Sequence, residues 1–421
     1  MNPLHGITAT TLSLALLALA PTPTATAHRN GSSTDGDVVS QWNAIAVDTI
    51  FVENLTPIPS GQVHFGFVSS AVYDAVRDAG RTRKSRAPGS VTAAVATAAH
   101  DVLVEYFPTS AAALDADLAG TLADVSDGRR TNRGIRIGAA AADELIEDRV
   151  GDGMNNTSIT LDVTLAPGVW RPTSPNTQMA VPWLGFVEPL LLDSPTQIRL
   201  GGPDDLDSRQ YAKDVAEVRS LGADDSTTRT DAQTETALFW NDNVVRQYQD
   251  AMRDLVDREE MSAREAARMF AAVNMTSADS IIACWRAKYD EAYWRPVTAI
   301  REAASDGNPR TTADAGWTPL VPSPPYPEYP SGHACLTGAM GTGIAQLAGS
   351  DHIDLFVASA VTGTTRHFTS ARQMIREAFN ARIWLGIHFR TAMEDGRLIG
   401  KKASRLGFGE LCLSNRRDNV R

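Results

Sequence analysis

Apolar residues recur at helical spacing along most of this 421-residue chain, and no other feature limits the fold as much. In the first such segment, residues 40–53, the spacing is carried by Trp42, Ile45, Ala46 and Ile50. Further helices are expected over residues 63–78, 91–106, 131–147, 208–221, 231–258, 262–301, 332–348 and 371–406. We find no alternating β-branched runs bounded by turns. The predicted fold class is therefore all-α, a helical bundle packed through apolar faces.

One segment without helical periodicity divides the chain. Residues 151–206 contain seven prolines, which is typical of a long connection wrapped over a bundle. This connection separates a predicted N-terminal bundle at about residues 40–150 from a second bundle at about residues 207–410. Both bundles would lie in one mature chain, residues 28–421.

Residues 1–27 resemble a secretory signal peptide. An apolar stretch from Leu12 to Ala20 is followed by a small-x-small cleavage site that ends at Ala27. That stretch is too short to span a bilayer as a helix, and no later stretch approaches about 18 uncharged apolar residues. We expect a secreted protein that begins near His28 and has no membrane span. A disordered tail that stays attached is the alternative.

Composition argues against several classes of partner and site. A net charge of −11 and a pI near 5.2 disfavour nucleic acids and anionic membranes as partners. The three cysteines, Cys284, Cys335 and Cys412, are too sparse for a disulfide framework. Buried free thiols are favoured, and a pair between Cys284 and Cys335 stays open. Without a Cys/His cluster, zinc is not expected.

Three short segments near the C-terminal end carry groups that suit a tetrahedral oxyanion. They supply three cations, a hydroxyl, a glycine N–H and two imidazoles: Lys288, Arg295, Ser331, Gly332, His333, Arg382 and His388. Cations neutralise oxyanion oxygens, and the neutral groups add donors. One imidazole can bond the central atom while the other moves a proton. Taken singly, the segments could be a charged surface, a helix N-cap and a core histidine, but together they favour one site.

The spacing of these residues predicts where they lie on helices. Lys288 and Arg295 are two helical turns apart, so both can face one way, and Pro296 would kink or end that helix. Ser331 and Gly332 precede an apolar helical run and are expected at its N-terminus, which favours an anion.

At these residues the chain resembles the vanadium-dependent haloperoxidases and their relatives, the type 2 phosphatidic acid phosphatases (the PAP2 superfamily). The superfamily signature is K-x6-R-P, then P-S-G-H, then S-R-x5-H-x3-D. The matches are Lys288 to Arg295, Pro330 to His333 and Arg382 to His388. The resemblance implies two four-helix bundles, with the site in the C-terminal one.

The resemblance also implies an activity. A secreted peroxidase of this family would hold vanadate and use hydrogen peroxide to oxidise halide to a hypohalous equivalent, which reacts with a small organic substrate. Vanadate oxygens would be bound by Lys288, Arg295, Ser331, Gly332 and Arg382. His388 would be the metal ligand, His333 would deprotonate peroxide, and Lys288 would polarise the bound peroxide.

Three further residues are assigned through the resemblance. Trp285 and Tyr326, the latter within a run from Pro324 to Ala334, are typical of the haloperoxidase branch and would line a halide pocket. Asp242 stands about where the family carries the aspartate that supports the acid–base histidine. An ordinary carboxylate on a helix surface is an equal alternative for Asp242.

Two positions depart from the signature. Ala381 stands where the signature has Ser, and Ala392 stands where it has Asp. On one continuous helix that Asp would share the face of His388 and could orient its imidazole. Asp395 shares the face too, but it would lie about 10 Å further along the axis. The partner of His388 is therefore not evident from the sequence.

Two rival functions remain open. In a phosphomonoesterase, His388 would attack phosphorus and His333 would protonate the leaving group. In an inactive exported helical relative, the site would have decayed, as Ala381 and Ala392 suggest. Vanadate-dependent bromide oxidation and phosphate release from p-nitrophenyl phosphate would distinguish all three.

Overall fold

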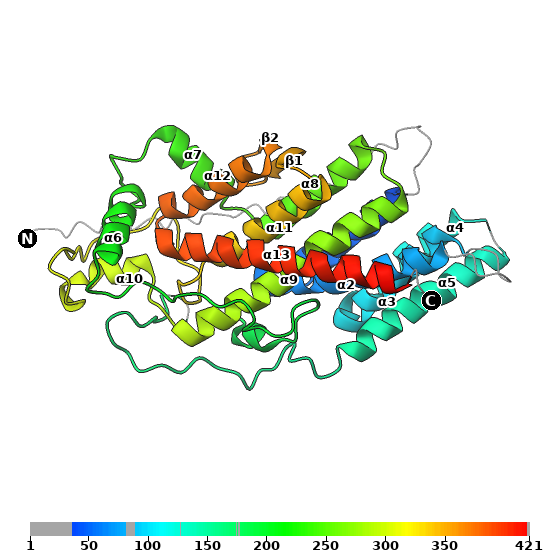
Figure 1. Cartoon of the computed structure of the whole chain (residues 1–421), viewed down its shortest axis with the longest axis horizontal. Helices are drawn as coiled ribbons and strands as arrows, with labels where there is room; N and C mark the ends of the chain where they lie inside the picture. Colours follow the sequence, from blue (N-terminus) through cyan, green and yellow to red (C-terminus); the bar gives the residue numbers. More distant parts are fainter. Residues whose placement is uncertain (1–35, 81–88, 127, 174, 176, 419–421) are drawn as a thin grey trace, which may run out of the picture. The chain divides into compact units, whose positions relative to one another are not determined.

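Thirteen α-helices carry most of the described chain in the computed structural model, which covers residues 36–80, 89–126, 128–173, 175 and 177–418 (Figure 1). The predicted signal peptide and the predicted mature start at His28 lie outside these residues. The all-α fold class is confirmed, apart from one β-hairpin. The division into two four-helix bundles stays a prediction.

The helices fall in two series, one on each side of a long connection. The first series is α1 (Asp37–Val47), α2 (Ile58–Ala79), α3 (Val91–Tyr106), α4 (Ala111–Ala123) and α5 (Arg129–Asp148). The second is α6 (Arg209–Leu221), α7 (Asp231–Phe239), α8 (Val244–Arg258), α9 (Ala263–Glu291), α10 (Pro296–Arg301), α11 (Gly332–Leu347), α12 (Ala371–Trp384) and α13 (Arg390–Asp418). Short π- and 3-10-helical turns occupy Asp48–Glu53, Pro108–Ser110, Pro182–Phe186 and Ala303–Ser305.

Helix α9 is the centre of the packing. Its N-terminus is closed by a capping box in which Ser262 and Glu265 bond each other's backbone N–H. Most residues from Ala263 to Trp285 are buried, as expected for a helix covered on several sides. It contacts α2, α11 and α13, and α2 in turn packs on α3 and α5 (Figure 1). In the last turn of α9, Lys288 points into the interior, whereas Asp290 and Glu291 are exposed.

The connection between α5 and α6 contains no α-helix among its described residues, and it is fixed to α9 by one buried carboxylate. Asp279 accepts hydrogen bonds from the backbone N–H groups of Leu190, Leu191 and Leu192 at 2.6, 2.8 and 2.8 Å. Burial raises the pKa of Asp279 to about 6, although these three donors favour the charged form.

The expectation that the chain has no strands was wrong at one place. Strands β1 (His352–Ser359) and β2 (Thr364–Ser370) form an antiparallel hairpin. Residues along β1 alternate between exposed and buried, with Ile353, Leu355 and Val357 inward. This is the period of a half-buried strand. The strand was missed because it also contains Leu355 and Phe356, so its sequence is not a run of alternating β-branched residues.

Three helices expected to be continuous are broken, each beside the motifs. The 231–258 helix stops at Trp240, and α8 restarts after Asn243, whose side chain caps it by accepting from Val245 and Arg246 N–H. The 262–301 helix is interrupted between Glu291 and Pro296, and the 371–406 helix between Trp384 and Arg390.

Backbone conformation explains the last two breaks. Ala292, after α9, has a left-handed φ of +42°. Gly386, after α12, has φ +79°, and a Cβ on it would lie 2.4 Å from the carbonyl oxygen of Gly222. Glycine is the residue that adopts such a φ at low cost and permits so close an approach. Both breaks turn the chain sharply next to Arg295 and His388.

Candidate active site

A cavity of about 520 Å³ brings the three motifs together. From the motifs it is lined by Trp285, Tyr326, Gly332, His333, Arg382 and His388. Other walls come from Pro57–Pro59 at the start of α2 and from Asn241–Val244 between α7 and α8. Residues from distant parts of the sequence therefore enclose one space.

Lys288 and Arg295 are fully buried beside this cavity. Lys288, in the last turn of α9, donates through Nζ to the carbonyls of Pro327 and Glu328 at 2.7 and 3.0 Å. Burial lowers the pKa of Lys288 to about 8. Arg295 is the N-cap of α10, so the prediction that one helix face carries both cations was wrong. They come together because the chain turns at Ala292.

Arg295 is held by backbone carbonyls. Its Nε donates to Tyr326 O at 2.8 Å, and its Nη1 donates to Ile387 O at 2.9 Å. Burial lowers the pKa of Arg295, and no carboxylate forms an ion pair with it among the described residues. Among the described residues, the Nη2 atom has no hydrogen-bond partner. One guanidinium edge is thus left to bind something else.

The Pro330–His333 segment lies where the sequence predicted. Ser331 caps α11, and its Oγ accepts from Ala334 N–H at 3.4 Å. A Cβ on Gly332 would lie 2.8 Å from the Trp285 ring, so only glycine allows this approach of helix start and indole. The free N–H groups of a 16-residue helix therefore begin at the cavity wall.

His333 is the first imidazole of the cavity. Its Nε2 is buried and has no hydrogen-bond partner in the described part of the chain, and its ring meets the Trp240 ring edge-on with centroids 6.3 Å apart. Burial, and next the charge of Arg382, lower its pKa well below the ordinary value. A neutral imidazole in this place can accept a proton.

Asp242 does not support His333 in the described structure. It lines the cavity, but its Oδ2 accepts from Ala360 N–H at 2.6 Å and its Oδ1 accepts from Asn243 N–H at 2.7 Å. The hydrogen bonds of the described residues include none between Asp242 and His333. Its predicted catalytic role stays a prediction.

Arg382 and His388 do not share one helix, so that prediction was wrong. Arg382 lies in the last turn of α12, where Nη1 donates to Trp240 O at 3.1 Å and Nε has no partner within the described ranges. Burial lowers its pKa to about 10. His388 lies in the connection after Gly386, which aims the imidazole inward from a different direction.

The neighbours of His388 define its tautomer. Nε2 lies 3.3 Å from Nη1 of Arg295, and a guanidinium can only donate. Nε2 must therefore carry the lone pair. Nδ1 then carries the proton, which it donates to Oε1 of Glu328 at 2.9 Å. Burial, and next the charges of Arg295 and Lys288, lower the pKa of His388 well below the ordinary value.

Glu328 is the functional candidate that the sequence analysis missed. It is buried, and its Oε1 accepts from both His388 Nδ1 and Phe389 N–H, each at 2.9 Å. Burial raises its pKa to about 8, against the lowering effect of Arg295. The available signal was one carboxylate inside the run Pro327-Glu328-Tyr329, five residues before His333. An acid in such an apolar run needs a buried partner.

Trp285 and Tyr326 form an aromatic wall, as befits the pocket predicted for them. Their ring centroids are 4.8 Å apart. Lys288 Nζ lies 5.5 Å from the Trp285 ring centroid and 5.3 Å from that of Tyr326, and Arg295 lies 5.0 Å from the latter. The rings shield the cations from water on this side. A halide at this wall stays a prediction.

The donor set fits a tetrahedral oxyanion such as vanadate. Among the residues of the three motifs, three buried polar atoms have no hydrogen-bond partner in the described chain: Arg295 Nη2, Arg382 Nε and His333 Nε2. Two of them belong to cations that donate otherwise to backbone carbonyls and not to carboxylates. Unpaired buried donors of this kind are costly without a ligand.

A family model described as "VCPO second helical-bundle domain" matches residues 268–411, which include all three motifs. The vanadium chloroperoxidase of Curvularia inaequalis is 28% identical over an alignment of 229 positions, which covers 39% of this chain and 37% of that protein. Both matches support the vanadium-dependent haloperoxidase family for this chain. The sequence match spans little more than a third of the Curvularia protein's length.

Solved structures of the family share the fold over most of the chain. A bacterial vanadium-dependent iodoperoxidase superposes with a TM-score of 0.74 at 21% identity, covering 91% of this chain and 98% of its own. A holo-type bacterial vanadium-dependent chloroperoxidase superposes with a TM-score of 0.68 at 19% identity, covering 83% of this chain and 91% of its own. No described helix is long and apolar enough to cross a membrane.

Proposed function

We propose that this protein is an exported enzyme that binds vanadate and uses hydrogen peroxide to oxidise halide. The observation that carries the proposal is the group of buried cations Lys288, Arg295 and Arg382, which donate to backbone carbonyls and have no carboxylate ion pair in the described chain. Burial of unpaired charge is costly. An oxyanion in the cavity supplies the missing negative charge.

Each group has a place in holding this anion. Lys288, Arg295 and Arg382 neutralise its oxygens, while Ser331 Oγ and the start of α11 add neutral donors. The lone pair on His388 Nε2, which accepts a long hydrogen bond from Arg295 Nη1 in the structure, bonds the central atom in exchange for that contact. Vanadate, when bound, supplies a Lewis-acidic centre that activates hydrogen peroxide toward halide.

His333 handles the proton. Its unpartnered Nε2 accepts a proton from incoming hydrogen peroxide and later returns it to the leaving oxygen. The overall reaction balances as hydrogen peroxide, halide and one proton giving hypohalous acid and water. Two electrons pass from the halide to the peroxide oxygen, so the protein side chains need no redox change.

The cavity also suits the later reactants. Its walls include Ile58, Ile281 and Leu336, together with the Trp285 and Tyr326 rings. A volume of about 520 Å³ with apolar walls fits a small organic molecule that the hypohalous equivalent can halogenate. The export of the protein rests on the predicted signal peptide.

The test uses one preparation of full-length protein, stripped of bound anions and assayed with and without added vanadate. Peroxide-dependent bromination of a dye that requires vanadate would support the proposal. Hydrolysis of p-nitrophenyl phosphate, with no vanadate-dependent bromination, would assign the phosphomonoesterase instead. A folded protein without either activity would identify an inactive relative. A protein with His333→Ala is the matched control, since it keeps the cations and loses the proton acceptor.

A further inference from the structure

His388 lacks the partner that the family signature provides. The signature carries Asp four residues after this histidine, and Ala392 stands there. Ala392 lies in the first turn of α13, and its carbonyl accepts from Ser331 N–H at 3.0 Å. An alanine side chain cannot bond an imidazole. If His388 is oriented at all, the orienting group comes from elsewhere in the fold.

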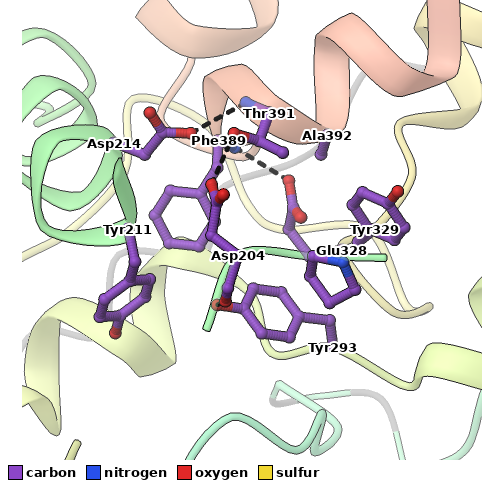
Figure 2. Close-up of a pocket in the computed structure, with 10 residues that line it drawn as sticks. Asp204, Tyr211, Asp214, Tyr293, Glu328, Tyr329, Phe389, Thr391 and Ala392 are labelled. Atoms are coloured by element: carbon purple, nitrogen blue, oxygen red, sulfur yellow. Dashed lines mark hydrogen bonds between the residues drawn. The ribbon is translucent and has the colours of Figure 1, made fainter. Parts of the chain in front are cut away.

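Figure 2 shows the surroundings of that position, a small pocket of about 10 Å³ bordered by Ala392, Glu328 and two aspartates. Both aspartates are bound to Thr391: Asp214 accepts from its N–H at 2.8 Å and Asp204 accepts from its Oγ1 at 2.7 Å. The space holds about one water molecule at most. Of the carboxylates bordering the pocket, Glu328 is the one that bonds His388.

The Glu328–His388 pair is closed to solvent. The two side chains expose 1% and 2% of their surface. Oε1 of Glu328 is an acceptor here, because Phe389 N–H also donates to it at 2.9 Å. An acceptor at Nδ1 and a donor, Arg295, at Nε2 allow only one neutral tautomer. That tautomer presents its Nε2 lone pair to the cavity.

The backbone of Glu328 ties the same residue to the cations. Its carbonyl accepts from Lys288 Nζ at 3.0 Å, and its N–H donates to Tyr293 O at 2.9 Å. One residue thereby spans the end of α9, the loop before α10 and the loop before α13. The side chain is located by the segment that locates Lys288, so the carboxylate and the cation keep a fixed separation.

We propose that Glu328 is the positioning residue of His388, and that it supplies from the segment before α11 the carboxylate that the signature places four residues after the histidine. This inference rests on the proposed function insofar as His388 bonds vanadium. It makes Ala392 compatible with a working site. It also moves the orienting carboxylate from the helix of the histidine to a segment 60 residues earlier.

The rival explanation is purely structural: Glu328 offsets buried positive charge and maintains the arrangement of Lys288, Arg295 and Arg382, which we call the cationic cage. The two explanations differ for two anions. Vanadate bonds the imidazole and the cations, whereas phosphate in its ground state uses the cations alone. Loss of a positioning residue weakens vanadate selectively. Collapse of the cage weakens both.

The experiment measures the dissociation constants of vanadate and inorganic phosphate by calorimetry on full-length protein. Wild type is compared with Glu328→Gln, Glu328→Leu and the control Asp395→Asn, which removes a nearby carboxylate that bonds Tyr329. In Glu328→Leu we expect vanadate affinity to fall about 10–100-fold, the usual cost of losing such an outer partner, with phosphate affinity nearly unchanged. Glu328→Gln keeps a hydrogen-bond acceptor, so its vanadate affinity should fall less. The control should match wild type.

A second readout needs neither vanadate nor activity. Histidine-selective ¹⁵N NMR of the ligand-free protein should show a hydrogen-bonded proton on His388 Nδ1, assigned by its loss in His388→Gln. The resonance of this proton should shift in Glu328→Gln and stay unchanged in Asp395→Asn. The proposal is overturned if wild type carries the proton on Nε2, or if vanadate and phosphate weaken equally. If the pair behaves as expected but no halide is oxidised, the proposed function fails and the positioning role stands.

Discussion

Replacement of Arg295 by alanine tests whether one cationic cage binds both oxyanions. Three of the contacts of this guanidinium are internal: Nε to Tyr326 O, Nη1 to Ile387 O, and Nη1 to His388 Nε2. Nη2 is buried and unpartnered, so it is the atom left for the anion. The cationic cage recognises the charge and shape of the oxyanion and does not distinguish its central atom. Vanadate and phosphate should therefore both be weakened.

The magnitude follows from this one atom. A hydrogen bond from a charged donor contributes about 1.5–3 kcal/mol. Each 1.4 kcal/mol is a factor of about ten, so Arg295→Ala should weaken each anion about 10–150-fold. Arg295→Lys keeps the charge but loses the forked geometry, so its affinity for each anion should lie between those of wild type and Arg295→Ala.

The assay titrates vanadate calorimetrically, alone and with phosphate present, in wild type and both variants. Arg301→Ala is the control, because Arg301 lies six residues away on α10 and donates to Trp317 O outside the cage. Circular dichroism checks that each variant is folded. The shared cage is refuted if phosphate leaves vanadate affinity unchanged, or if folded Arg295→Ala binds both anions as before.

Four further outcomes are expected. His388→Ala should abolish vanadate-dependent peroxidase activity with an unchanged circular dichroism spectrum, and wild-type turnover with full vanadium content would contradict the assignment. N-terminal sequencing of exported protein should find a start near His28, whereas Met1 would rule out cleavage. Phosphate affinity should fall as pH rises through about 8, because Lys288 loses its proton there while Glu328 loses its own, and calorimetry on both sides of pH 8 should see a smaller fall in Lys288→Gln. Gly386→Ala should lower stability by at least about 1–2 kcal/mol, since alanine is strained at φ +79°; an unchanged midpoint of thermal unfolding would refute it.

Helix positions were the part of the fold most open to prediction. The expected 91–106 helix coincides with α3, and the expected starts of α6 and α11 fall within one residue of the observed ones. These starts depend on Ser208 and Ser331, whose hydroxyls accept backbone N–H groups three residues ahead. Capping and apolar spacing are local effects, so a short stretch of sequence contains the information.

The site was predictable as a set of residues but not as a geometry. Spacing suggested that Lys288 and Arg295 share a helix face, and that Arg382 and His388 lie on one helix. In both pairs the helix ends between the two residues. The apolar spacing typical of a helix continues through both breaks, but packing against neighbouring segments of the chain interrupts the helix. At Gly386, for example, the backbone of Gly222 leaves no room for a Cβ.

The sequence by itself determined an all-α chain, the N-terminus of α11 at the anion site, and the cations and imidazoles that bear the chemistry. Only the tertiary structure decided how these groups are aimed and what orients them. Glu328 and His388 are 60 residues apart, and no periodicity links them. Their pairing arises because two buried polar groups must find partners when water is excluded, and which partner is within reach depends on the packing of distant segments.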